Sequence, residues 1–151
     1  MDKKHKKSTE ELLGTLTDSN YSLDTYLNTN DEQFIVCNVA RVLNQMISEK
    51  NVKRIDAIRQ SDLSPNYAYQ IFSGKKCNPS RDIIIALCIG VKLTLEETQK
   101  VLKECGYPML YAKVKRDSII IYGICHRFSV IEVNERLADH FETLIEGTQE
   151  A

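Results

Sequence analysis

The chain has 151 residues, of which 42% are hydrophobic and 27% charged, with only three prolines and six glycines. This composition excludes a wholly disordered chain and indicates a soluble globular protein of one ordinary domain, with or without an appendage. The formal net charge of −1 conceals an asymmetry, because residues 38–116 hold 14 Lys/Arg against 7 Asp/Glu, whereas residues 8–37 hold six acids and no Lys or Arg.

The longest apolar runs, 83–91 and 119–124, are too short for a membrane span. The basic start, residues 1–7, is followed by no apolar stretch of a secretory signal, so we expect a cytoplasmic protein without a membrane partner. Widely spaced cysteines without a C-x-x-C pair indicate free thiols in a reducing compartment: Cys37, Cys77, Cys88, Cys105 and Cys125. A zinc site built on Cys125 and His126 is the alternative, but it lacks the paired ligands that zinc needs, and we expect no metal and no cofactor.

Residues 1–37 are predicted to form a tail and a helical arm. Ser8-Thr9-Glu10-Glu11 has the pattern of a capping box, which starts a first helix with an apolar stripe of Leu12, Leu13 and Leu16. Asp18-Ser19-Asn20 predicts a break, and a second short helix follows with Leu23, Tyr26 and Leu27.

The next helices are predicted from helical spacing and from start and stop signals. Val39, Leu43, Met46 and Ile47 share one face of a helix that begins near Asp31 or Asn38 and ends at Lys50. A helix over Lys53–Gln60 follows, then the turn Ser61-Asp62-Leu63. Ser64 is predicted as N-cap and Pro65 as first residue of a helix that ends at Ser73, with Gly74 as its stop.

Four further helices complete an all-α prediction. Ser80 caps a helix through Ile89, and Thr94-Leu95-Glu96-Glu97 opens one that stops at Gly106. The apolar segment Lys115–His126 is expected to be a helix buried on most sides. Ser129-Val130-Ile131-Glu132 opens a long last helix, whose stripe is close to heptad spacing and consists of Val130, Val133, Leu137, Phe141 and Leu144.

The run Leu63-Ser64-Pro65-Asn66-Tyr67-Ala68-Tyr69-Gln70-Ile71-Phe72-Ser73-Gly74-Lys75-Lys76, followed by Asn78-Pro79-Ser80, resembles the XRE-type helix-turn-helix of the lambda-repressor and Cro class. The similarity covers about residues 39–102. It implies a lambda-repressor-like five-helix domain at 38–106, with the arm 1–37 before it. The helical extension 107–151 would pack on this domain or serve dimerisation.

The chain departs from the family pattern at Ile58, where the family usually has Ala, and at Ala68, where it has Ile or Val. If these side chains face each other, large and small have changed sides and the summed volume is kept. Asp62 replaces the usual Gly and can adopt the left-handed conformation of the turn. Phe72 stands where the family commonly has Glu, and we expect it to pack against the first helix of the domain.

The resemblance implies a sequence-specific double-stranded DNA-binding regulator of transcription, with the recognition helix 64–73 in the major groove. Asn66 and Gln70 can each make a bidentate contact with adenine, and Tyr67 and Tyr69 can reach a phosphate or a thymine methyl. Arg54 matches the family position that clamps a phosphate, and Lys53 is a further phosphate candidate. The predicted DNA-binding set is Arg54, Ser64, Pro65, Asn66, Tyr67, Tyr69, Gln70, Lys75 and Lys76.

Proteins of this class usually bind two half-sites as dimers, so Leu137, Phe141 and Leu144 are predicted to help form a homodimer contact. Intramolecular packing is the alternative for the same stripe. An enzyme is not expected, because the chain has no phosphate-cradling glycine loop, no H-E-x-x-H and no nucleophile elbow. The alternative functions are a protein-interaction adaptor that kept the fold and lost DNA binding, which the acidic flanks favour, and an antitoxin that combines both roles.

Overall fold

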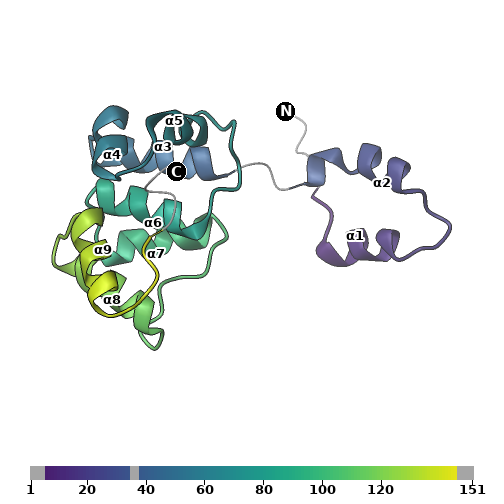
Figure 1. Ribbon diagram of the computed structural model, residues 1–151. Helices are drawn as coiled ribbons and strands as arrows, with labels where there is room; N and C mark the ends of the chain where they lie inside the picture. The colour runs from purple at the N-terminus through teal and green to yellow at the C-terminus, as the bar shows by residue number, and fades with distance from the viewer. Residues whose placement is uncertain (1–5, 35–37, 146–151) are drawn as a thin grey trace. The chain divides into compact units, whose positions relative to one another are not determined.

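The computed structural model describes residues 6–34 and 38–145, and every regular element within these two stretches is helical. The all-α prediction is therefore confirmed for the described part of the chain. The chain divides into two compact units, Met1–Val36 and Cys37–Ala151 (Figure 1). None of the helices in the described stretches has the length and apolar content that crossing a bilayer requires.

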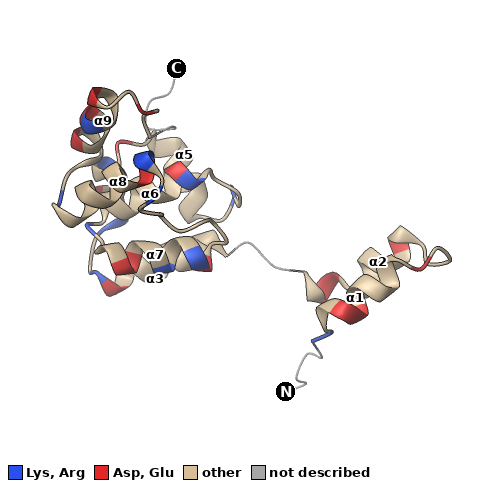
Figure 2. Cartoon of the chain, turned by 90° about the horizontal axis from the view of Figure 1, so that it is seen from below, with Lys and Arg blue, Asp and Glu red and all other residues tan. Residues whose placement is uncertain are grey.

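The first unit contains α1 (Thr9–Leu16), α2 (Leu23–Thr29) and the short 3-10 helix η1 (Asp31–Gln33). The Ser8 hydroxyl accepts a hydrogen bond from the Glu11 N–H, as its predicted capping role requires. The predicted leucine stripe forms no core, because Leu13 and Leu16 are 57% and 52% exposed and α1 buries none of its residues. Acidic side chains lie on both α-helices of this unit (Figure 2).

In its described residues, the second unit contains α3 (Val39–Glu49), α4 (Arg54–Gln60), α5 (Pro65–Phe72), α6 (Arg81–Gly90), α7 (Leu95–Glu104), α8 (Lys115–Cys125) and α9 (Val130–Asp139). Helices α3, α4 and α5 lie at one end of this unit and α8 and α9 at the other, with α6 and α7 between them (Figure 1). Every residue of α6 from Ile83 to Gly90 is buried, and α6 packs against α4, α7 and α9. It is the central element of the hydrophobic core.

Most predicted helix ends are found where the sequence placed them. Thr94 and Ser129 each form a complete capping box, and Ser80 accepts the Ile83 N–H. Helix α5 is followed by Gly74 at φ 85°, and α7 by Gly106 at φ 83°, so both glycines adopt the left-handed conformation that ends a helix.

The last helix is shorter than predicted. It ends at Asp139, and the Glu142 N–H donates to the Leu137 carbonyl across a turn in which Phe141 has φ 59°. Leu137 is fully buried within its own chain, whereas Phe141 and Leu144 lie beyond the helix and are 97% and 45% exposed. The predicted continuous stripe is therefore wrong, because the turn at His140 and Phe141 redirects the chain before the last two members. Leu137, predicted at a dimer contact, is instead part of the core.

Helix α8 is also less buried than predicted. Ile120, Gly123 and Ile124 are buried, but Ile119 and Ile121 are half-buried and Tyr122 is 54% exposed. The difference arises because α8 packs mainly on α7 and α9, which cover only part of its circumference.

Residues 107–145 belong to the same compact unit as α3–α7, so the extension packs on the helices before it, which is one of the two roles predicted for it. Two Arg-Asp dipeptides join the parts reciprocally. Arg81 of α6 makes two 3.0 Å hydrogen bonds to the Asp117 carboxylate of α8, and Arg116 of α8 bonds the Asp82 carboxylate of α6 at 3.0 and 2.8 Å. Both pairs are largely shielded from solvent, with each side chain at most 22% exposed.

The two arginines also hold the connecting segments. Arg81 donates to the carbonyls of Pro108 and Met109, in the connection between α7 and α8. Arg116 donates to the carbonyls of Thr143 and Leu144, which follow α9. The start of α6 thus anchors the start of α8 and the segments on both sides of the α8–α9 hairpin.

Replacing Asp117 by Asn should remove an acid-sensitive part of the stability. Burial raises the pKa of the Asp117 carboxyl, but the hydrogen bonds from Arg81 and from the Tyr111 N–H, together with the charges of Arg81 and Arg116, lower it more, so the pKa lies below its ordinary value. The carboxylate therefore stabilises the fold above the unfolded-state pKa, and this contribution is lost as pH falls through the folded-state pKa. We expect Asp117→Asn to lower the free energy of unfolding by about 3 kcal/mol at neutral pH. The difference in this free energy between the variant and the native chain should become smaller below about pH 4.

Urea unfolding from neutral to acidic pH measures both effects. Asp56→Asn is the matched control, because Asp56 forms only an exposed pair with Arg59 at 3.8 Å, and such pairs contribute roughly 0–1 kcal/mol. A loss for Asp117→Asn no larger than for the control would show that the buried pair does not hold the two parts together.

Candidate nucleic-acid interface

Helices α4 and α5 are joined by the short turn Ser61–Leu63, as the sequence predicts. Asp62 has φ 59°, so it adopts the left-handed conformation expected where the family pattern has Gly. Ser61 is fully buried and its hydroxyl donates to the Ile58 carbonyl at 2.6 Å. Ile58 and Ala68 are both buried, on two helices that pack against each other, which agrees with an exchange of large and small side chains.

The turn packs closely against the end of α6. A Cβ atom added to Gly90 would lie 2.8 Å from both the Ala57 carbonyl oxygen and the Ser61 nitrogen. Since both neighbours are backbone atoms, neither can move aside without shifting α4 or the turn. Because Gly90 has no side chain, α4 and the turn can approach the backbone of α6 closely, and this close approach sets the position of the α4–α5 pair on the core.

A cluster of three residues fixes the far end of α5. The Asn44 side-chain amide of α3 donates to the carbonyls of Ala40 and Phe72, each at 2.8 Å, and its oxygen accepts from the Arg54 guanidinium at 2.8 Å. The Arg54 guanidinium carbon lies 5.4 Å from the centre of the Phe72 ring, in reach of a cation–π interaction. Phe72 is 2% exposed, where α5 packs on α3.

This cluster changes the role expected of Arg54. The resemblance implies a guanidinium that clamps a phosphate, but the structure engages it with Asn44 and Phe72. Arg54 remains exposed to solvent, so a phosphate contact would use a side chain already oriented by α3 and α5. The sequence could not show this, because Asn44 is ten residues away and carries no motif.

The outer face of α5 is formed by the residues predicted to meet DNA bases. Pro65, Asn66 and Tyr69 are exposed, and Gln70 is half-buried. Tyr67 is also half-buried and packs against the core, so only part of its side chain is open to a DNA contact. Ala68, Ile71 and Phe72 form the buried inner face.

The start of α5 differs from the prediction in one respect. Ser64 occupies the N-cap position and Pro65 the first turn, as expected, but the Ser64 hydroxyl accepts no backbone N–H. Pro65 has no N–H to satisfy, and its fixed φ suits the first helical position without help from a side-chain cap.

Basic residues flank this face. Residues 50–80 contain six Lys/Arg and two Asp, a net charge of +4 (6 − 2). Lys53 precedes α4, and Lys75 and Lys76 follow α5, and all three are exposed. The Lys76 N–H donates to the Gln70 carbonyl at 3.0 Å, which holds this lysine pair close to the end of α5.

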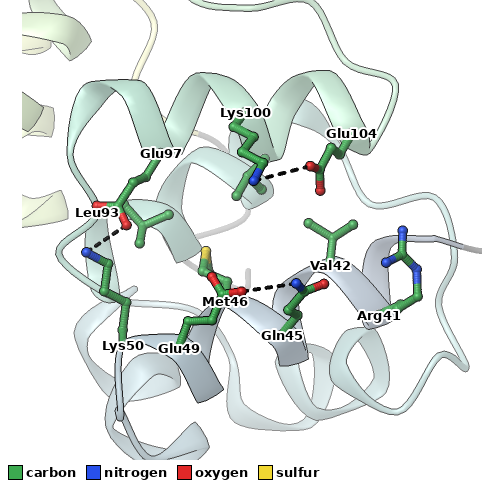
Figure 3. A pocket seen from close by; sticks show the side chains of 11 residues that line it. Arg41, Val42, Gln45, Met46, Glu49, Lys50, Leu93, Glu97, Lys100 and Glu104 are labelled. Atoms are coloured by element: carbon green, nitrogen blue, oxygen red, sulfur yellow. Dashed lines mark hydrogen bonds and ion pairs between the residues drawn. The ribbon is translucent and has the colours of Figure 1, made fainter.

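A second feature, which the sequence analysis missed, is a groove of about 350 Å³ between α3 and α7 (Figure 3). Four of its charged side chains form pairs, Lys50 with Glu97 at 2.7 Å and Lys100 with Glu104 at 3.9 Å. The other two form hydrogen bonds with neutral side chains, Arg41 with Asn38 and Glu49 with Gln45. The hydrogen bond from Lys50 is the main reason that the pKa of Glu97 lies below its ordinary value. Lys50 is thus engaged with α7, unlike the lysines that flank α5.

The structure also describes the surroundings of two other chemical candidates, His126 and Cys88. His126 stacks on Tyr122 with 3.8 Å between ring centres, and the described residues contain no group of three His, Cys, Asp or Glu side chains that could hold a metal ion. Burial raises the pKa of the Cys88 thiol, which keeps it protonated. His5 and Cys37 lie outside the described residues.

Comparison with known proteins identifies no relative: the chain matches no protein-family model, no curated protein and no solved structure. The properties of the α4–α5 surface therefore rest on its own geometry: a short helix with polar side chains outside, an apolar inner face and lysines on both flanks.

Replacing Gly90 by Ala should destabilise the second unit. The added methyl group would overlap two backbone atoms, and overpacking of this kind costs about 1–3 kcal/mol. Thermal unfolding followed by circular dichroism measures the loss. Gly14→Ala is the matched control, because an added Cβ there meets nothing within 4 Å in a helix of the first unit. An unchanged melting temperature for Gly90→Ala would show that the α4–α6 contact adjusts freely.

Proposed function

We propose that this protein is a cytoplasmic regulator of transcription that binds double-stranded DNA sequence-specifically, with α5 in the major groove. The observation that carries the proposal is the two-sided character of α5. Asn66, Tyr69 and Gln70 lie on its outer side, while Ala68, Ile71 and Phe72 hold its inner side on α3 and α4. The XRE-type pattern in the sequence supports the same function.

The size and chemistry of α5 suit direct readout of bases. Eight helical residues span about 12 Å at 1.5 Å per residue, and the major groove is about 12 Å wide. Asn66 and Gln70 are four residues apart and therefore share one side of the helix. Their amides can each donate to and accept from one adenine, and the exposed Tyr69 ring can contact a thymine methyl or a phosphate.

The lysines supply the electrostatic part of binding. Lys53 lies directly before α4 and the Lys75–Lys76 pair lies after α5, so basic residues stand at both ends of the α4–α5 pair along the chain. Each lysine that neutralises a phosphate releases condensed counterions, which makes affinity fall as salt rises. Arg54, already oriented by Asn44 and Phe72, would add a contact with little loss of side-chain freedom.

The first unit favours a second function, that of a protein-interaction adaptor. Its helices expose Leu13, Leu16, Leu23 and Leu27, and residues 8–34 carry six acids without a Lys or Arg. An exposed apolar face with acidic surroundings suits a partner protein that offers an apolar groove with basic edges. An antitoxin would combine this surface with DNA binding, and so would a regulator that recruits another protein.

Selection of bound duplexes from a random pool, followed by anisotropy titrations over a salt series, tests the proposal. Lys75→Ala/Lys76→Ala should weaken binding about equally for all duplexes and reduce the slope of log affinity against log salt by about 2. Asn66→Ala and Gln70→Ala should each cost about 1–3 kcal/mol on the selected duplex and relax specificity.

Lys103→Ala is the matched control, because Lys103 is an exposed lysine on α7 that lies outside the α4–α5 surface. It should leave both the affinity and the salt slope close to those of the native chain. Absence of duplex binding at low salt would refute the regulator and favour the adaptor.

A further inference from the structure

The Phe141 side chain is almost fully exposed to solvent. It is 97% exposed, the largest value among the exposed large hydrophobic residues, and it has φ 59°. The left-handed conformation is unfavourable for a bulky side chain, and water around an aromatic ring is unfavourable as well. Within its own chain, neither cost is offset by burial.

The residue before Phe141, His140, lines a groove. It occupies about 380 Å³ between α8 and α9 and is lined by Lys115, Ser118, Ile119, Tyr122, Arg136 and His140. Ile119 and Tyr122 are one turn apart on α8 and provide apolar surface, while α9 contributes Arg136 and its C-cap residue His140. His140 belongs to the groove, yet the next residue, Phe141, is directed outward by its left-handed backbone.

The ring and the groove are complementary in charge as well as in polarity. Asp139 and Glu142 stand close to Phe141 in the sequence, so the ring is presented by an acidic segment. The groove contributes Lys115 and Arg136. Lys115 is already engaged within its own chain, because it lies 3.9 Å from the Glu142 carboxylate and donates to the His140 carbonyl at 3.1 Å. Arg136 is therefore the cation of the groove that is left for an incoming carboxylate. Arg136 already lies 5.6 Å from the centre of the Phe128 ring, so its guanidinium is placed among aromatic side chains.

We propose that two copies of this chain associate about a twofold axis, each inserting Phe141 into the α8–α9 groove of the other. A projecting ring next to a groove that accepts it makes one surface complementary to itself, which is the requirement for a closed, isologous dimer. The same contact would bury the exposed ring and bring the acidic segment of one copy to Arg136 of the other.

This inference goes beyond DNA binding and does not depend on it. Helix α5 lies at the opposite end of the unit from α8 and α9 (Figure 1), so the interface leaves the outer face of α5 uncovered in both copies. A dimer formed in this way could present two reading helices, but its formation is measured without any DNA.

Sedimentation velocity of the full chain over a concentration series tests the proposal. Phe141→Gly is the informative variant, because glycine removes the ring and also suits the left-handed backbone, so the monomer should be at least as stable as the native one. We expect the dimer dissociation constant to rise at least tenfold, as for a central aromatic contact. Ile131→Ala is the matched control: Ile131 is 57% exposed on α9 but does not line the groove, and its loss should leave dimerisation unchanged.

Mixing two defective variants gives a sharper test. Ser118→Phe fills the groove with the chain's own ring, and this variant should associate as weakly as Phe141→Gly. A mixture should associate more strongly than either variant alone, because the Ser118→Phe chain offers a ring and the Phe141→Gly chain offers an open groove. If circular dichroism shows that Ser118→Phe does not fold, Arg136→Glu, at an exposed position, replaces it as the groove variant.

Three results would overturn the proposal. The native chain could remain monomeric at the highest concentrations, Phe141→Gly could associate as the native chain does, or the mixture could associate no better than its components. Dimerisation through the first unit would show as the second result. Failure of duplex binding leaves this test unaffected, so the two proposals fail independently.

Discussion

The burial of α6 from its third residue onward is the constraint on which the second unit depends. From Ile83 to Gly90 every residue of this helix is buried, so every neighbouring helix must be placed by contact with it. The two ends of α6 position the neighbouring helices through different interactions. Gly90 at the carboxyl end lets the backbone of α4 approach without a side chain between them, and Arg81 and Asp82 at the amino end bind α8 through paired charges.

These two ends give the unit two surfaces with different properties. Near Gly90, the position of α4 and of the turn after it determines where α5 lies on the core. The Asn44 side chain then joins α3, α4 and α5 through hydrogen bonds. Near Arg81, the reciprocal pairs fix the α8–α9 hairpin, whose groove and projecting Phe141 form the other surface. The proposed DNA contact and the proposed dimer contact are therefore held by one helix yet kept apart from each other.

The charge distribution follows the same division. The lysines beside α5 remain exposed, whereas Lys50, Arg81 and Arg116 are engaged in ion pairs within the unit. A count of basic residues along the chain therefore overstates the charge available to a polyanion, because Lys50, Arg81 and Arg116 are already paired within the unit. The acidic first unit exposes leucines instead, which suits contact with protein rather than with DNA.

Sequence alone determined the helical class, most helix ends and the inner and outer faces of α5, because capping boxes, glycine stops and helical spacing act within a few residues. It placed Thr94, Ser129, Gly74 and Asp62 correctly for that reason. It failed at Phe141, where a short turn ended a periodic stripe. Only the tertiary structure decided the reciprocal Arg–Asp pairs, the engagement of Arg54 and the two grooves. The hydrogen bonds of these pairs and of Arg54 join residues 10 to 36 positions apart, and each groove lies between two separate helices, so no local pattern predicts them.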